Sequence, residues 1–202
     1  LQTNEADYGW NMQVSPDVIN EMLTAGNGYI LATAGTSTES IYINYTDPNV
    51  EASTGERSSL ENPHPALTDL NVRKAMSFAI DRDTIANEFY GNGQMAAWRY
   101  LVGIPAYEND NLPYTYDPAM ANQLLDDAGW AMDGSTRAKD GVELKFVYHT
   151  SINPVRQDTQ AVVQANLADV GIEAELKSTD ATIYFDSGVG NDQNINHFYT
   201  DL

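Results

Sequence analysis

Apolar residues recur every three or four positions in several segments of the chain, which is the spacing of one face of an α-helix. Ser15 and Asp117 are each followed by Pro, a combination typical of helix starts, and Gly26 and Gly129 are typical helix ends. The pattern predicts helices at residues 15–26, 69–80, 83–90 and 117–129. We expect their apolar faces to form part of a core.

A different pattern, with apolar and polar residues alternating, begins at Val142 and continues through Tyr148. A helical segment follows at 153–171, and a second alternating run covers 172–177. Strand, helix and strand of these lengths predict a right-handed βαβ unit at 142–177 with parallel strands. Two further strand-like runs, 29–34 and 41–45, predict an antiparallel pair. The fold class is therefore α/β, with a mixed sheet and helices on both faces.

Composition and net charge limit the classes of molecule that the protein is expected to bind. The chain has 202 residues, 42% of them apolar, which is enough for a substantial core. Its net charge of −19 repels phosphate, so nucleic acid and anionic membrane surfaces are poor candidates for partners, and we expect no nucleic acid. This charge favours high solubility in a salty or extracellular setting, or a patch that recruits a cationic partner. There is no Cys, no membrane-spanning apolar run and no signal-peptide pattern.

Motifs for catalysis are missing from the sequence. It has no nucleophile elbow, no phosphate-binding loop and no zinc-protease motif, and its three His residues lie far apart. We therefore expect no catalytic residue, no metal and no cofactor. Asn44-Tyr45-Thr46 matches a glycosylation sequon, a tripeptide that also occurs often by chance.

The pattern supports binding better than catalysis. Ligands of open α/β sheets gather beyond the carboxyl ends of parallel strands, which here is the segment 149–153. Thr150, Ser151 and Asn153 are the candidate ligand-binding residues, although the same side chains could merely cap the following helix. Trp10 and Trp98 occupy loop-like sequence, where large rings line a cleft or pack against the core.

Several blocks resemble one known family. Residues 71–82, which end in Ala-Ile-Asp-Arg, resemble the VRxAxxxAIDR block of the extracytoplasmic solute-binding proteins of family 5. These are the oligopeptide- and dipeptide-binding receptors of ABC importers. Residues 116–130 are similar to the family's YDPxxAxxLLxxAGW block, and the strand, Thr-Ser loop, helix and Val-Gly-Ile of 144–172 resemble a third region. Shorter similarities lie at 6–8 and 45–48, so the resemblance covers most of the chain.

The resemblance implies a two-lobed protein of the periplasmic-binding-protein type (class II) that closes on its solute and delivers it to a membrane permease. Residues 1–202 would form a single lobe, the ligand-facing middle domain, with the other lobe absent. Ligand-facing segments of the family correspond to Thr150, Ser151 and Asn153, and to Trp10 and Asn11. We expect an extracytoplasmic monomer, periplasmic or lipid-anchored, that binds peptides and is not an enzyme.

Other possibilities stay open at this point. The family also includes receptors for nickel complexes and sugars. The acidic group that holds a peptide amino terminus in many receptors would fall at or beyond Leu202. Some receptors place a basic residue in the Thr-Ser loop for the ligand carboxylate, and here only Arg156 is close. An extracellular hydrolase or sugar-processing domain with a carboxylate pair is the alternative function, and a sensor domain with the same fold is a third.

Overall fold

The computed structural model describes residues 3, 5–10, 14–31, 37–91, 95–97, 105–107, 114–188 and 190–202. The chain forms two compact units. The first comprises Leu1–Thr38 and Arg82–Asn111, and the second comprises Glu39–Asp81 and Leu112–Leu202. In the described part of the chain, no helix combines the length and the apolar character that a bilayer crossing requires.

The first unit contains short helices. These are α1 (Pro16–Thr24), α3 (Arg82–Ile85), the π-helical turn η1 (Ala86–Tyr90) and the 3₁₀ turn η2 (Pro105–Tyr107). Ser15 stands at the N-cap of α1 as the sequence predicts, but its side chain makes no capping hydrogen bond. The helix expected at 83–90 is present as two pieces, because its second half winds into a π-helix.

Two capped helices, α2 (Leu70–Ala79) and α4 (Pro118–Asp127), pack against each other in the second unit. The carboxylate of Asp69 accepts a hydrogen bond from the backbone N–H of Asn71, and that of Asp117 accepts one from Met120. Both helices therefore begin where the sequence predicts. Their contact belongs to a core whose fully buried members include Leu67, Val72, Ala75, Ala121 and Leu125.

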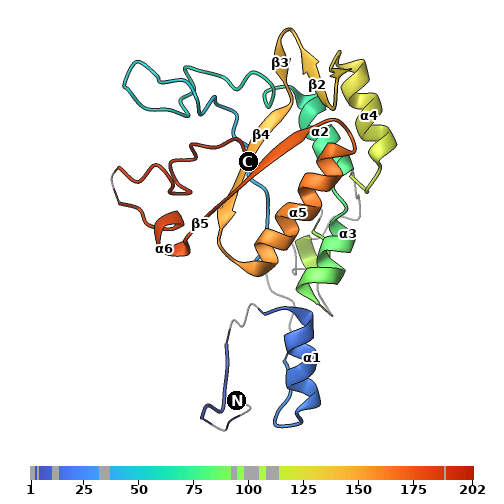
Figure 1. Ribbon diagram of the computed structural model, residues 1–202, viewed down its shortest axis with the longest axis vertical. Coiled ribbons are helices and arrows are strands. Elements are labelled where there is room, and N and C mark those ends of the chain that lie inside the picture. Colours follow the sequence, from blue (N-terminus) through green and yellow to red (C-terminus); the bar gives the residue numbers. More distant parts are fainter. Residues whose placement is uncertain are drawn as a thin grey trace. The chain divides into compact units, whose positions relative to one another are not determined.

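The predicted βαβ unit is confirmed. Strand β4 (Lys145–Ser151) pairs in parallel with β5 (Glu173–Thr179), and α5 (Pro154–Ala168) connects them (Figure 1). A side chain that breaks the apolar pattern of α5 is Gln160, which is buried and donates from Nε2 to the carbonyl oxygens of Tyr148 at 2.8 Å and Lys177 at 3.2 Å. These bonds tie α5 to both strands.

The antiparallel strands form a separate sheet of their own. Strands β1 (Ala131–Asp133), β2 (Thr136–Lys139) and β3 (Val142–Glu143) pair in that order. The single strand expected at 142–148 is therefore divided. At the break, the N–H of Leu144 donates to Arg137 of β2, while its carbonyl accepts from Glu173 at the start of β5. Parallel and antiparallel strands thus occur together in the α/β fold, but in two sheets.

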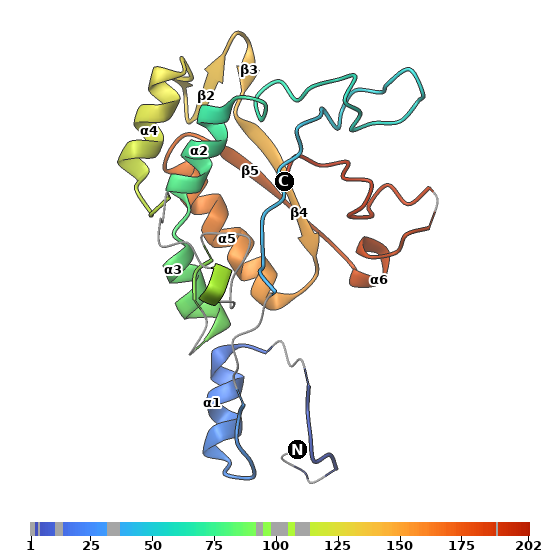
Figure 2. The ribbon, with the colours of Figure 1, turned by 180° about the vertical axis from the view of Figure 1, so that it is seen from behind.

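The prediction of an antiparallel pair between 29–34 and 41–45 is wrong for the described residues. Neither 29–31 nor 41–45 forms a strand, and residues 32–34 lie outside the described part. Thr46 makes an isolated bridge with Pro63 instead. Asn44 donates its backbone N–H to Asp201, so the 41–46 segment finds its partner near the other end of the chain (Figure 2).

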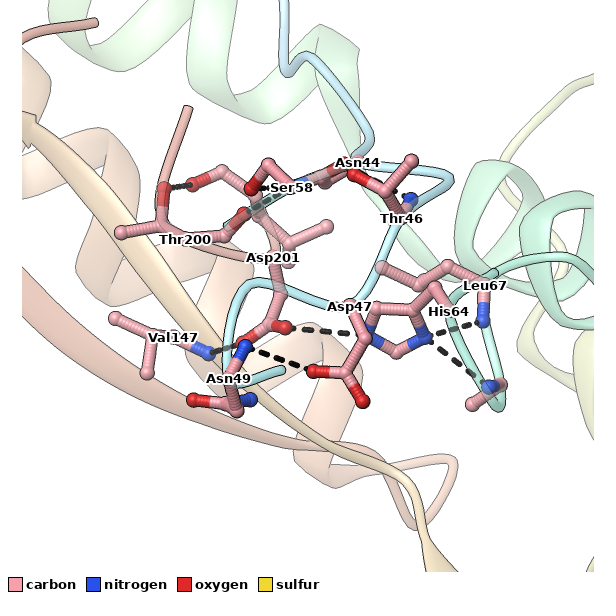
Figure 3. Close-up of polar contacts among 12 residues, drawn as sticks. Asn44, Thr46, Asp47, Asn49, Ser58, His64, Leu67, Val147, Thr200 and Asp201 are labelled. Carbon is pink, nitrogen blue, oxygen red and sulfur yellow. Dashed lines mark hydrogen bonds and ion pairs between the residues drawn. The ribbon is translucent and has the colours of Figure 1, made fainter. Parts of the chain in front are cut away.

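The segment 200–202 lies along β4. The N–H of Leu202 donates to Val147 at 3.1 Å and its carbonyl accepts from His149 at 3.0 Å, which is the pattern of a parallel ladder. The carboxylate of Asp201 accepts from the N–H of Val147 at 2.7 Å and lies 3.1 Å from Nε2 of His64 (Figure 3). Asp201 therefore fixes this segment to both β4 and the 64–67 turn.

The buried imidazole of His64 has a defined tautomer. Its Nδ1 accepts hydrogen bonds from the backbone N–H groups of Ala66 and Leu67, at 3.0 and 2.9 Å (Figure 3). A nitrogen that accepts carries no proton, so the proton of the neutral ring is on Nε2 and points at Asp201. His64 is a structural residue in this arrangement.

The Asn44 side chain is buried in the same cluster. Its Nδ2 donates to the carbonyl oxygens of Phe198 at 2.8 Å and Thr200 at 2.9 Å. The amide nitrogen that would carry a glycan is thus occupied inside the folded unit. A glycan on this nitrogen would therefore displace the two buried hydrogen bonds.

Candidate functional site

The candidate site is the edge of the parallel sheet at which both strands end. Ser151, the last residue of β4, stands opposite Thr179, the last residue of β5, and the N–H of Ile152 donates to the Thr179 carbonyl at 2.8 Å. The short helix α6 (Ala181–Tyr184) begins directly afterwards and is capped by Asp180. Because the strands are parallel, the loops that follow them meet at this one edge.

Residues 150–153, called the β4 loop below, comprise the last two residues of β4 and the connection to α5. The three candidate residues of this segment have different surroundings. Thr150 is half-buried, and its hydroxyl has no hydrogen-bond partner among the described residues. Ser151 is buried, and its Oγ accepts from Nη1 of Arg156 at 2.8 Å. Asn153 accepts from the N–H of Arg156 at 3.2 Å and so caps α5, the role that the sequence also allowed. Thr150 thus offers the open polar group of the loop.

Arg156 links the loop to a distant segment. Its Nε donates to Oε1 of Glu39 at 2.5 Å, across 117 positions of sequence. The guanidinium carbon also lies 6.0 Å from the centre of the Phe185 ring, which is half exposed. The Arg156 side chain therefore contacts three other parts of the second unit: the β4 loop through Ser151, the start of the unit through Glu39, and the residue after α6, Phe185.

His149, near the end of β4, belongs to a hydrogen-bonded chain that crosses the edge. Its ring nitrogen Nε2 lies 2.8 Å from the Thr179 hydroxyl, which in turn donates to Oε1 of Gln193 at 3.1 Å. Tyr184 packs edge-on against the imidazole, with ring centres 4.9 Å apart. Burial, with a smaller effect from the Lys177 cation, lowers the pKa of His149 to about 4. His149 is therefore neutral at physiological pH and donates from Nε2.

The other three candidate residues are not part of this end of the β4–β5 sheet as the structure describes it. Trp10 belongs to the first unit and its side chain is 78% exposed. Asn11 and Trp98 fall outside the described residues. The structure therefore brings together Thr150, Ser151 and Asn153.

Sequence reasoning missed Glu39, Thr179 and Phe185. Thr179 could have been found from the sequence, because it lies just after the second predicted strand and parallel strands end at the same edge of a sheet. Nothing in the sequence pattern marks the pairing of Glu39 with Arg156. In the described part of the chain, no three His, Asp or Glu side chains gather in a way that could hold a metal ion.

Comparison with known proteins decides the family. The pattern of the bacterial extracellular solute-binding proteins, family 5 (middle part), matches residues 1–199. The chain belongs to this family. Its fold agrees, because the solved structures that it resembles are binding proteins of family 5 with the periplasmic-binding-protein type of α/β fold.

Individual relatives of this family 5 chain are much longer. A putative ABC transporter peptide-binding protein of Brucella ovis is 33% identical over 120 residues, which cover 59% of this chain and 22% of that protein. The structure of NikA from Brucella suis in complex with Fe(III)-EDTA has a TM-score of 0.57 at 28% identity and covers 84% of this chain and 31% of that one. AppA from Bacillus subtilis, solved with a nonapeptide, has a TM-score of 0.51 at 31% identity, covering 56% and 24%. The chain thus spans between a fifth and a third of these proteins.

Proposed function

We propose that this chain is the ligand-facing middle lobe of a two-lobed solute-binding protein, which captures peptides outside the cell membrane and delivers them to an ABC permease. The observation that carries the proposal is the open hydroxyl of Thr150 at the carboxyl edge of the β4–β5 sheet. Family membership supports solute binding, and the peptide-binding relatives support this class of solute.

The edge has the chemistry that an extended peptide requires. A peptide backbone presents both N–H and C=O groups, and the Thr150 hydroxyl is able to donate to the one or accept from the other. The neighbouring Ile152 side chain is 55% exposed and offers an apolar contact. Trp10, Asn11 and Trp98 complete the proposed set of ligand-binding residues. Membership of a family of solute-binding proteins supports a binding protein and no enzyme, and the proposal takes it to act as a monomer.

A metal chelate is the second candidate solute, because NikA, which covers most of this chain, was solved with Fe(III)-EDTA. The two candidates differ in the contacts they need. A chelate is compact, whereas an extended peptide reaches several residues along the edge and the opposite lobe. The alternative hydrolase function has no support from the family, whose members are described as solute-binding proteins.

Calorimetry on the complete receptor tests the proposal with a short neutral peptide mixture and, separately, with nickel–histidine. We expect peptide binding, and Thr150→Val to weaken it about tenfold with an unchanged melting temperature, since the substitution removes one hydroxyl and keeps the shape. Thr54→Val, on an exposed loop, is the matched control and should change neither value. Binding of nickel–histidine alone would overturn the assignment to peptides.

The isolated 202-residue chain provides a second measurement. A two-lobed site needs contacts from both lobes, and closure around the solute contributes to affinity. We therefore expect the isolated chain to bind the same peptides very weakly. Micromolar or tighter binding by this chain alone would contradict the two-lobed proposal.

A further inference from the structure

Arg156 is the cation of the first turn of α5, directly beside the candidate loop. Its guanidinium has two fixed partners on different segments, Oγ of Ser151 at 2.8 Å and Oε1 of Glu39 at 2.5 Å. The Arg156 side chain is only 24% exposed, and Ser151 is fully buried. A guanidinium held by two partners in this way is oriented by the protein itself before any solute arrives.

Glu39 neutralises that cation. Its carboxylate bonds Arg156 through one oxygen, and its side chain is 48% exposed on the same edge of the sheet. A solute carboxylate that approached Arg156 would come close to the negative charge of Glu39 as well. Because the attraction and the repulsion act over similar distances, most of the attraction would be cancelled.

The remaining cation near this end of the two strands is Lys177, among the described residues. It stands opposite His149 in the parallel register, two positions before β5 ends at Thr179. The loop itself presents Thr150, whose side chain is polar and uncharged, and the apolar Ile152. The side chains that the loop presents are therefore uncharged, and the Arg156–Glu39 pair beside them has no net charge, although the chain as a whole carries a charge of −19.

We propose that Arg156 is a positioning residue, which holds the 150–153 loop through Ser151 and Glu39, and that the loop receives an uncharged polar stretch of the solute, such as peptide backbone, and not a carboxylate. This inference rests on the proposed function. It assigns Arg156 a role different from the carboxylate contact that its position near the loop suggests from the sequence.

The test compares one neutral peptide as its free acid and as its carboxyl-terminal amide, with affinities measured by calorimetry on the complete receptor. We expect Arg156→Gln to weaken both forms by the same factor, about tenfold, because the loop loses its support. Glu39→Gln should weaken the amide by a similar factor and the free acid less, because the charge of Arg156 is then no longer neutralised. The exchanged pair Glu39→Arg with Arg156→Glu should restore most of the affinity for both forms, since a carboxylate at position 156 is able to accept from the Ser151 hydroxyl. Arg57→Gln, which breaks the more exposed pair with Asp192 at 3.3 Å, is the matched control and should change neither affinity.

A different set of results would overturn the inference. If Arg156 binds a solute carboxylate, Arg156→Gln removes a preference for the free acid, leaves the amide unaffected, and is not rescued by the exchanged pair. Melting temperatures of all variants show whether each remains folded. If the exchanged pair fails to fold, the ratio of acid to amide affinity in Arg156→Gln decides alone, because it compares two ligands of one protein. A receptor that binds neither form but binds nickel–histidine would overturn the proposed function, and this inference with it.

Discussion

The indole nitrogen of Trp130 donates a hydrogen bond to Oδ2 of Asp69 at 3.1 Å, across 61 positions of sequence. The other oxygen of Asp69 accepts from the N–H of Asn71 and caps α2. Trp130 closes the block of sequence that contains α4, and Asp69 begins the helix that carries most of the 71–82 block. The two most specific family motifs therefore meet in the core, where they stabilise the fold.

Asp69→Ala tests this double role. The substitution removes the cap of α2 and leaves the buried indole N–H of Trp130 without its partner, so we expect the free energy of unfolding to fall by about 2–3 kcal/mol. Asp117→Ala is the matched control, because Asp117 caps α4 through Met120 and hydrogen-bonds no Trp among the described residues. It should cost only about 1 kcal/mol. Urea unfolding measures both, and equal losses would contradict the contribution of Trp130.

Gly171 separates α5 from β5 and is restricted in two ways. Its φ is +80°, and a Cβ atom placed on it would lie 2.6 Å from Sδ of Met132 and 2.8 Å from Cγ of Arg137. We expect Gly171→Ala to destabilise the protein by about 2–4 kcal/mol, since backbone strain and overpacking add. Gly134→Ala also has a positive φ, +66°, but no atom within 4 Å, and should cost about 1 kcal/mol. Similar melting temperatures for the two variants would show that the close contact carries no cost.

Helix caps and the spacing of apolar residues predicted those elements whose formation depends on residues close in sequence. Asp69 and Asp117 begin helices because their carboxylates cap them, and alternation followed by a helix and a Gly predicted the βαβ unit. The strand at 142–148 was predicted in one piece because alternation does not reveal that Leu144 bonds β2 on one side and β5 on the other. Which strand a backbone group pairs with depends on the tertiary structure and not on the local sequence pattern.

The candidate site shows the same limit. Thr150, Ser151 and Asn153 follow from the rule about the ends of parallel strands, and the structure brings them together. Glu39 does not follow, because its pairing with Arg156 joins residues 117 positions apart. Buried Gln160 likewise interrupts an apolar helix face, and only the positions of the strand carbonyls explain it.

Arg137 is a buried cation that joins three segments. Its guanidinium donates to the carbonyl oxygens of Val170 at 2.9 Å and Trp130 at 2.6 Å, and to Asn122 at 2.8 Å, and it pairs with Asp126 at 2.5 Å. Arg137→Met keeps much of the aliphatic volume but leaves the two buried carbonyl groups of Val170 and Trp130 without a donor, so we expect a loss of about 3–5 kcal/mol in the free energy of unfolding.

The control for Arg137 is an ion pair on the surface. Lys145 lies 2.6 Å from Glu173, but both side chains are about half exposed. Lys145→Met should therefore cost less than about 1 kcal/mol, because solvent screens such pairs. Chemical denaturation of both variants provides the comparison. A loss at Arg137 no larger than that at Lys145 would mean that water satisfies the freed carbonyl groups.

His149 makes the stability of the second unit depend on pH. Burial, with a smaller effect from Lys177, lowers its pKa from the ordinary 6.5 to about 4 in the folded state, while the unfolded chain keeps the ordinary value. Between these two pH values the unfolded state binds a proton that the folded state does not. The contribution of His149 is therefore fully present above pH 6.5 and is lost as the pH falls toward 4, by up to about 3 kcal/mol.

Urea unfolding at several pH values between 7 and 4.5 checks this dependence on His149 against His149→Gln, whose amide is able to keep the donor to the Thr179 hydroxyl. We expect the free energy of unfolding to fall more steeply with acidification in the unmodified protein, because the variant has no imidazole to protonate. The carboxylates titrate in both proteins and cancel in the difference. An NMR titration should find the His149 ring neutral down to about pH 5. Parallel stability curves, or a ring that protonates near pH 6.5, would show that water reaches the imidazole and that its burial has no effect on stability.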